Sequence, residues 1–356
     1  MSQSQTSGSS NPEYVNARLR TRRSKLFDND DYRKLVRMGT GEIARYMEES
    51  AYESAINRLG ARHSGVDLIE YSLNRNLATQ FNDLLGWAEG KLYDQIAAYL
   101  RTFDAWNAKT ALRGVYSGEP ADGIQTDYIT AGEFGPTLLD ELAAAESVEE
   151  VVELLGETIF GEGLDQAYQQ FTENETLVAL ENAIDRAFYE HLLDGIDTTV
   201  QEGPAALYLE ALQAEIDFRN VRNALRLSET GTNLDPAAYY ISGGRLFSET
   251  QLRRLTGDMN ALLEHLRESS YGDDLDAALD ALAEADSLVQ FEQALDAALL
   301  EYADQLAYRY PVSVCSALSY ILAKEREVEN IRAIARGREV GLAVEEIEQE
   351  LVVTRG

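Results

Sequence analysis

The sequence contains very little cysteine and proline. A single cysteine, Cys315, excludes both a disulfide framework and a metal site built from several thiolates. It lies in the apolar stretch YPVSVCSALSYILA, which predicts a small buried core residue. Only six prolines occur among 356 residues, and the chain is rich in Ala, Leu, Glu and Arg, which are strong helix formers. These features predict an all-α fold.

Lysine is also scarce, and positive charge is outweighed throughout. Only five of the 31 basic residues are lysines, and they face 62 acidic residues, which gives a net charge of −31. Such acidity argues against nucleic-acid binding and against general adhesion to an anionic lipid surface. The acids are spread along the whole chain, so a surface adapted to a salt-rich cytoplasm explains them better than one acidic binding face.

Long apolar runs are absent. The most apolar stretch lies between Arg309 and Lys324 and includes three serines, so it is shorter than the roughly 18–20 apolar residues that a membrane span needs. The N-terminal MSQSQTSGSSNP lacks the apolar core of a signal peptide and is typical of a flexible polar tail over residues 1–12. We expect a soluble intracellular protein without a transmembrane segment, which meets a membrane only through a partner.

Sequence motifs of catalysis are missing as well. The chain has no glycine-rich phosphate loop, and His63, His191 and His265 match no metal-ligand spacing. The stretch GDDLDAALD (272–280) is more typical of an acidic helix start than of a magnesium-diphosphate site. We therefore predict a protein without catalytic residues, cofactor, metal or small-molecule substrate.

A ten-residue phrase occurs three times. It combines an acid with Asn three residues later, a base at five and Arg at nine. The copies are DAWNAKTALR (104–113), DFRNVRNALR (217–226) and EVENIRAIAR (327–336). Because three copies recur about every 110 residues, the phrase indicates an internal repeat.

Two further patterns recur at the same offset. An eight-residue pattern with a central Glu appears as DLIEYSLN (67–74), VALENAID (178–185) and VQFEQALD (289–296). A third pattern aligns YITAGEF (128–134) with YISGGRL (240–246), with a weaker counterpart near LVRMGTGEI (35–43). We predict three similar helical domains: repeat 1 over 13–118, repeat 2 over 119–231, and repeat 3 with the C-terminal helix over 232–356.

The phrase predicts an amphipathic helix with a polar group on its buried face. Apolar residues stand one, four, seven and eight positions after the acid and fill one face at about 100° per residue. The acid lies inside that face, Asn lies at its edge, and the Arg at position nine points away. The residues predicted to be inside or at the edge are Asp104, Asn107, Asp217, Asn220, Glu327 and Asn330, together with Glu70, Glu181 and Glu292 of the eight-residue pattern.

Buried carboxylates of this kind have two interpretations. They could form a catalytic pair or a metal site, or they could accept backbone N–H groups and fix how helices pack. Burial of an unpaired charge is costly in either case. Triplication favours packing, because catalytic sites rarely occur in three intact copies.

The basic residues suggest interaction surfaces. Between Arg18 and Arg37 there are eight bases and only three acids, which indicates either a solvated helix face or a docking surface for an acidic partner. The outward bases of the phrase have the same two interpretations. The candidates for partner binding are Arg18, Arg22, Lys109, Arg113, Arg222, Arg226, Arg332 and Arg336.

Four segments resemble one family. EYVNARLRTRRSKLF (13–27), DAWNAKTALRG (104–114), EIDFRNVRNALR (215–226) and KEREVENIRAIARGREVGL (324–342) are similar to the C subunit of archaeal A-type rotary ATP synthases, a relative of the d subunit of the vacuolar ATPase. The match is spread over residues 13–350. The acidity and the shortage of lysine suit a haloarchaeal member.

The resemblance implies a funnel of three helical domains about a pseudo-threefold axis. It further implies a non-catalytic, peripheral protein at the cytoplasmic face of the membrane, which joins the rotor shaft, made of the D and F subunits, to the proteolipid ring and transmits torque. Two other classes stay open on the residues alone: a general α-helical repeat scaffold, and a helical enzyme in which Glu181 and Asp217 line an open pocket.

Overall fold

The structure is a computed structural model that describes residues 9–197, 199, 202–230, 239–256, 258–272, 279–280 and 288–352. Within these residues no strand is formed, and the regular elements are helices. The predicted all-α class is therefore confirmed. The chain divides into two compact units, each of which is described by itself.

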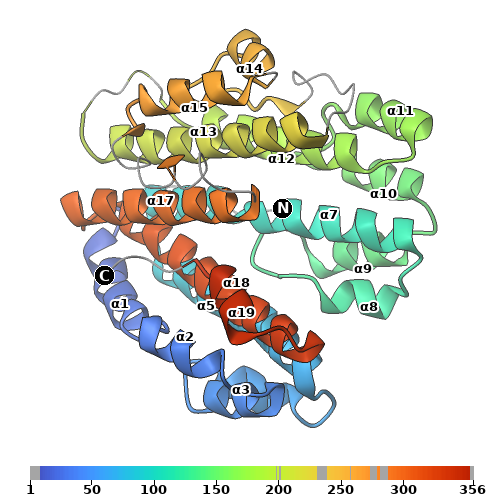
Figure 1. Cartoon of the computed structure of the whole chain (residues 1–356), viewed down its shortest axis with the longest axis vertical. Coiled ribbons are helices and arrows are strands. Elements are labelled where there is room, and N and C mark those ends of the chain that lie inside the picture. Colours follow the sequence, from blue (N-terminus) through green and yellow to red (C-terminus); the bar gives the residue numbers. More distant parts are fainter. Residues whose placement is uncertain are drawn as a thin grey trace. The chain divides into compact units, whose positions relative to one another are not determined.

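Unit 1 contains residues 1–98, 129–131 and 300–356. It brings the start and the end of the chain together, since the long helix α18 packs against both α1 and α5. Helices α3 and α4 cover α5, and α19 folds back on α18. Its helices are α1 (Pro12–Arg23), α2 (Asn29–Leu35), α3 (Thr40–Glu48), α4 (Glu53–Leu59), α5 (Gly65–Trp87), α18 (Val314–Val340) and α19 (Val344–Gln349) (Figure 1).

Unit 2 contains residues 99–128 and 132–299. Helix α7 packs against α8, α9, α10 and α12, and α13 packs against α14. Its helices are α7 (Thr102–Ser117), α8 (Ala121–Thr126), α9 (Pro136–Ala144), α10 (Val148–Leu155), α11 (Leu164–Asn174), α12 (Val178–Asp194), α13 (Pro204–Thr230), α14 (Glu249–Leu255) and α15 (Met259–Arg267). Helices α6 (Gly90–Leu100) and α17 (Leu288–Arg309) have residues in both units.

Local sequence signals explain where many helices begin and end. Ser313 starts α18 by accepting a hydrogen bond from the amide of Cys315, and Asp28 with Asp31 forms a capping box at α2. At the other end, Gly118 and Gly341 close α7 and α18 in the left-handed region, with φ of 73° and 78°. Each cap satisfies backbone groups that the helix leaves unpaired.

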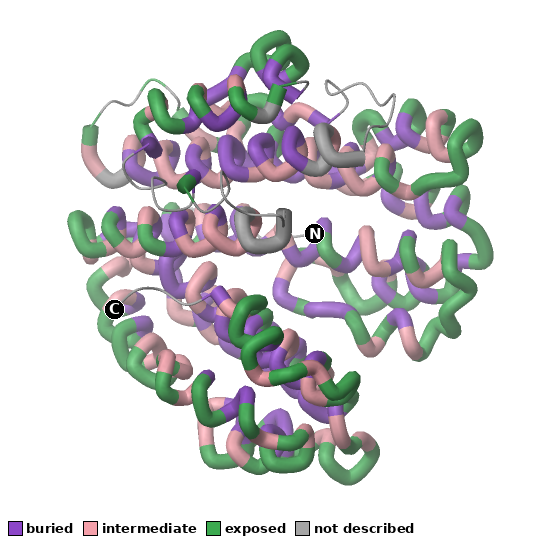
Figure 2. The backbone as a smooth tube through the Cα atoms, in the orientation of Figure 1, coloured by how far each residue is buried: buried purple, intermediate pink, exposed green. Residues whose placement is uncertain are grey.

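The predicted apolar face of the repeated phrase is buried in all three copies. It comprises Ala105, Ala108, Ala111 and Leu112 on α7, Phe218, Val221, Ala224 and Leu225 on α13, and Val328, Ile331, Ile334 and Ala335 on α18. The separation of buried from exposed positions along these helices can be followed in Figure 2. Cys315 is buried as predicted. The apolar periodicity therefore correctly predicted which side of each helix meets the core.

The division into two units does not show the three predicted domains or their pseudo-threefold arrangement. The domain boundaries at 118/119 and 231/232 stay a prediction, and the second boundary falls within residues 231–238, outside the described part. Most of the predicted tail over 1–12 and of GDDLDAALD (272–280) also lies outside the described residues.

Candidate functional site

The acids of the first two phrases each bind a loop through its backbone. Asp104 on α7 accepts hydrogen bonds from the amides of Glu133 (2.7 Å) and Phe134 (2.9 Å). Asp217 on α13 accepts them from Arg245 (3.0 Å) and Leu246 (2.9 Å). Both carboxylates are buried. They therefore join α7 to the loop before α9, and α13 to the loop before α14, as the packing interpretation describes.

These loops approach the carboxylates so closely that only glycine fits. A Cβ on Gly132 would lie 2.2 Å from Oδ1 of Asp104, and a Cβ on Gly244 would lie 2.2 Å from Oδ1 of Asp217. Both distances are far shorter than van der Waals contact. The two glycines occupy the same position in YITAGEF and YISGGRL. The third sequence pattern thus marks the loop that receives the acid of the phrase.

Burial changes the acidity of these two groups. It raises the pKa of Asp104 to about 6, although the two loop amides oppose the shift. Burial also raises the pKa of Asp217, against the effect of its loop amides and of the Tyr271 hydroxyl, which donates to it at 3.0 Å. Neither carboxylate has a cation at ion-pair distance among the described residues. Backbone dipoles are their main compensation.

The third copy binds its acid differently. Glu327 on α18 accepts from the amide of Phe27 at 2.5 Å, from the hydroxyl of Tyr52 at 2.6 Å, and from the ammonium of Lys324 at 2.5 Å. The side chains of Lys324 and Glu327 are each only 2% exposed. Burial lowers the pKa of Lys324 despite the nearby carboxylate. The backbone amide that holds this acid belongs to Phe27 in the N-terminal segment. It does not come from LVRMGTGEI (35–43), the weaker counterpart of the third pattern.

The asparagine of the phrase holds a second backbone segment. Asn220 exchanges two hydrogen bonds with the backbone of Ile241, at 2.8 and 2.9 Å. Asn330 makes the same pair with Val352, at 2.8 and 3.0 Å. Asn107 is buried at the corresponding position of the first copy. An amide side chain suits this role because it donates and accepts at once.

The bases of the phrase bind the eight-residue pattern of another copy. In unit 2, Lys109 pairs with Asp185 at 2.6 Å, and Arg113 reaches both oxygens of Glu181 at 2.6 and 2.9 Å. Arg222 pairs with Asp296. The base at position five therefore meets the last residue of the pattern, while the Arg at position nine meets its glutamate.

Unit 1 repeats the same contacts between the third copy and the first. Arg332 donates to Asn74 at 2.7 Å, and Arg336 pairs with Glu70, with a second hydrogen bond of 3.0 Å. The order of these contacts is copy one to two, two to three, and three to one. The corresponding base Arg226 has its side chain outside the described part. Glu292 is half-buried.

The position-five contact in the first copy is part of a larger buried cluster. Asp185 also pairs with Arg219 at 3.0 Å. Burial would raise the pKa of Asp185, but Arg219 and Lys109 hold it below its usual value. Burial also lowers the pKa of Lys109 despite its partner. The opposite charges of Asp185, Lys109 and Arg219 thus offset the cost of removing each of them from water.

The predicted glutamates lie less deep than the acids of the phrase. The side chains of Glu70 and Glu181 are 16% and 26% exposed, while those of Arg336 and Arg113 are 62% and 55% exposed. The geometry places these pairs at the border of the core. Five of the six phrase bases predicted to bind a partner are thus engaged within the chain, and their role in partner binding stays a prediction.

The N-terminal bases face an aromatic side chain. Arg18 lies over the rings of Tyr14 and Trp87, at 4.7 and 4.9 Å from their centroids. Arg22 lies over Trp87 and pairs with Asp83 at 2.5 Å. Both bases thus help to join α1 to α5, and their predicted role in docking is not tested by these contacts.

Sequence reasoning missed the partners of the bases and the buried Lys324. The signals were nonetheless present. The last position of the eight-residue pattern is Asn74, Asp185 or Asp296, which gives a side-chain acceptor in every copy. Lys324 stands three residues before Glu327, a spacing that lets two side chains on one helix meet.

Comparison with known proteins decides the family. The ATP synthase (C/AC39) subunit family matches residues 15–350. The chain belongs to this family.

Individual relatives agree. The chain is 60% identical over 348 residues to the C subunit of the A-type ATP synthase of Haloferax volcanii, covering 98% of this chain and 99% of the relative. It is 56% identical to that of Halobacterium salinarum, with the same coverage, and 34% identical to that of Methanosarcina barkeri, covering 97% and 94%. These matches confirm the family suggested by the sequence and support its haloarchaeal character. Membership of the family makes the chain one of the subunits of an A-type ATP synthase complex.

Two further features, a membrane-spanning helix and a metal-binding group, were not found among the described residues. No helix there is long and apolar enough to cross a membrane. No group of three or more His, Cys, Asp and Glu side chains in the same residues is arranged to hold a metal ion.

Proposed function

We propose that this chain is the non-catalytic central-stalk subunit that couples the rotor shaft, made of the D and F subunits, to the proteolipid ring of an A-type ATP synthase. It lies peripherally at the cytoplasmic face of the membrane and transmits torque during ion-driven ATP synthesis. The observation that carries the proposal is similarity along 94% or more of each of the relatives described above, all of which are C subunits of A-type ATP synthases.

The internal contacts support a mechanical role. Torque transmission requires that helices keep their positions under load, and densely packed interiors are stiff. Each phrase adds polar contacts to that packing: an acid that holds a loop, an asparagine that holds a backbone segment in the second and third copies, and bases that hold another copy. The polar side chains of the phrase named here are thus engaged in packing.

The order of the contacts supports three domains about a pseudo-threefold axis. In an open repeat scaffold the last copy has no reason to contact the first. Here Arg332 and Arg336 of the third copy bind Asn74 and Glu70 of the first. We therefore prefer the threefold funnel to an open scaffold. The same contacts favour a non-catalytic role over the enzyme alternative, because Glu181 pairs with Arg113 and Asp217 binds a loop.

Affinity purification of the tagged chain from native membranes at high salt tests this function. We expect the shaft subunits, the proteolipid and the catalytic head to be recovered together. Inverted vesicles from cells that lack the chain should retain ATP hydrolysis by the head but lose ATP-driven ion pumping. Recovery of the chain without any of these subunits would contradict the proposal.

A further inference from the structure

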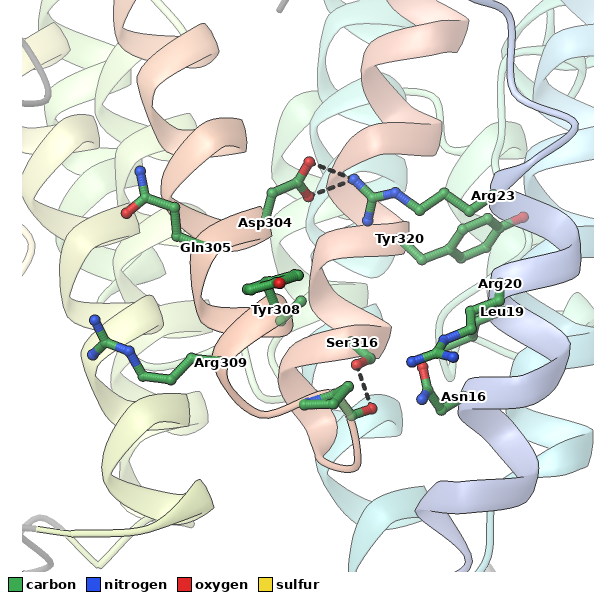
Figure 3. Close-up of a pocket in the computed structure, with 12 residues that line it drawn as sticks. Asn16, Leu19, Arg20, Arg23, Asp304, Gln305, Tyr308, Arg309, Ser316 and Tyr320 are labelled. Atoms are coloured by element: carbon green, nitrogen blue, oxygen red, sulfur yellow. Dashed lines mark hydrogen bonds and ion pairs between the residues drawn. The ribbon is translucent and has the colours of Figure 1, made fainter. Parts of the chain in front are cut away.

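A hollow of about 1050 Å³ opens in unit 1 between α1 and the turn that joins α17 to α18. Leu19, Arg20, Tyr308, Arg309 and Tyr320 belong to its lining. In the view of Figure 3 the side chain of Arg20 points from α1 toward α17, and that of Arg309 extends from α17 away from α1. We call it the α1–α17 groove. None of the contacts of the repeated phrase described above uses it, so its residues are not explained by that network.

One side of the groove is held in place by polar contacts. Arg23 pairs with both oxygens of Asp304 at 2.5 Å, and the hydroxyl of Ser319 donates to the same carboxylate at 2.5 Å. Asp304 is the only acid among the described residues that line the groove, and Arg23 neutralises it. The remaining charges of the groove are therefore Arg20 and Arg309.

These two arginines have no acidic partner among the described residues, even though the chain has twice as many acids as bases. They come from different helices, α1 and α17, and lie on opposite sides of the view with Tyr308 between them (Figure 3). The groove is thus a locally positive surface on a chain whose net charge is −31. Such a surface is complementary to negative charge.

Apolar surface continues along the rim. Tyr308 is 91% exposed, and Tyr310 and Val312 in the following turn are 38% and 44% exposed. Single exposed apolar residues are ordinary, but three within five residues beside a groove form a patch. Tyrosine and arginine together are typical of the residues that contribute most to protein interfaces.

We propose that the α1–α17 groove binds an acidic polypeptide segment of another subunit of the complex, with Arg20 and Arg309 pairing with two separate carboxylates and Tyr308 packing against the segment. A polypeptide fits better than a single phosphate or headgroup, because the two guanidinium groups stand apart and the rim is apolar. Arginine suits the pairing since its planar group binds a carboxylate through two hydrogen bonds. This inference rests on the proposed function.

A photo-crosslinker placed at position 308 tests the groove in the intact complex. The chain with benzoylphenylalanine in place of Tyr308 is produced in its host, irradiated in native membranes and purified, and the crosslinked peptides are identified by mass spectrometry. We expect one main crosslink, to a segment of another subunit that carries two or more Asp or Glu. The double variant R20E/R309E should lower its yield by at least about fivefold.

The matched control is R58E, which reverses an exposed base on α4 in the same unit and should leave the yield unchanged. Arg309 also stands in the last turn of α17, where a base is favourable to the helix dipole. The unfolding transition of R20E/R309E is therefore measured as well, and a loss of crosslinking counts only if that transition is unchanged. Should the double variant be destabilised, R20Q and R309Q replace it.

Crosslinks to lipid, to a second copy of this chain or to a segment without acids would overturn the proposal, as would no crosslink in an assembled complex. Each of these results leaves the proposed function intact if shaft and proteolipid subunits still copurify. Failure of copurification instead contradicts the proposed function, and with it the acidic segment as occupant.

Discussion

The acid of the repeated phrase is bound in two different ways in the two units. In unit 2, Asp104 and Asp217 are short, meet a glycine of the receiving loop and have no cation at ion-pair distance among the described residues. In unit 1, the side chain of Glu327 is one methylene longer. It accepts a hydrogen bond from the amide of Phe27 and pairs with the buried Lys324. The residue before that amide is Leu26 rather than glycine.

The difference shows that side-chain length and loop sequence compensate for each other. A short acid requires the backbone to come close, and only glycine allows that approach. The longer glutamate reaches a loop that carries a full side chain, and it is as deeply buried as Asp104 and Asp217. Glu327 accepts one loop amide where each aspartate accepts two, and Lys324 and Tyr52 supply the remaining compensation.

The largest expected effect comes from removing the cation in unit 1. Lys324→Met leaves Glu327 buried without its charge partner, and we expect a loss of about 3–5 kcal/mol in the free energy of unfolding. Denaturant unfolding at constant high salt measures the loss. Hydrogen exchange should show it in α4 and α18 and not in α7. The double variant K324M/E327Q should recover part of the stability; equal instability of both variants contradicts the explanation.

The second prediction concerns pH and unit 2. The folded-state pKa of Asp104, about 6, is above its ordinary 3.8. The folded chain therefore holds a proton at pH values where the unfolded chain has lost it, so this group's contribution to stability falls as pH rises from about 4 to about 6. The full change is on the order of 3 kcal/mol.

The pH dependence is measured as the free energy of unfolding of the wild type and of D104N across that interval. The difference between the two curves isolates the group, since every other titrating residue is shared. Parallel curves would show that Asp104 titrates normally.

The third prediction tests the close approach of the loops. Gly132→Ala and Gly244→Ala place a methyl group 2.2 Å from a carboxylate oxygen, so we expect each to cost about 1–3 kcal/mol. Thermal unfolding at fixed salt measures it. Gly135→Ala is the control, because a Cβ there meets nothing within 4 Å. A similar loss in all three variants would mean that helix and loop propensities, rather than contact with the acid, set the cost.

The smallest effects are expected at the exposed pairs, where the two units should behave alike. Arg113→Ala and Arg336→Ala each remove an ion pair whose arginine side chain is more than half exposed. We expect losses of about 0.2–1 kcal/mol, decreasing further as salt is raised. Chemical denaturation at two salt concentrations measures this. A loss above about 2 kcal/mol in only one unit would show that the pairs are not equivalent.

Much of this protein follows from its sequence. The periodicity of DFRNVRNALR was sufficient to predict a helix, its buried face and an inward Asp217, because side-chain direction along a helix is fixed by about 100° per residue. The triplicate spacing predicted equivalent roles, and Asp104, Asp217 and Glu327 are indeed all buried. The resemblance in the same segments predicted the family that the comparisons confirm.

Tertiary structure alone decided which groups meet. A helical angle says that Arg113 and Arg336 point away from their own acids, but their partners Glu181 and Glu70 lie 68 and 266 residues away. Likewise, the amide that receives Glu327 is 300 residues distant, at Phe27. The sequence of one helix determines the direction of its side chains; the charge that a side chain meets depends on which distant segment packs beside it.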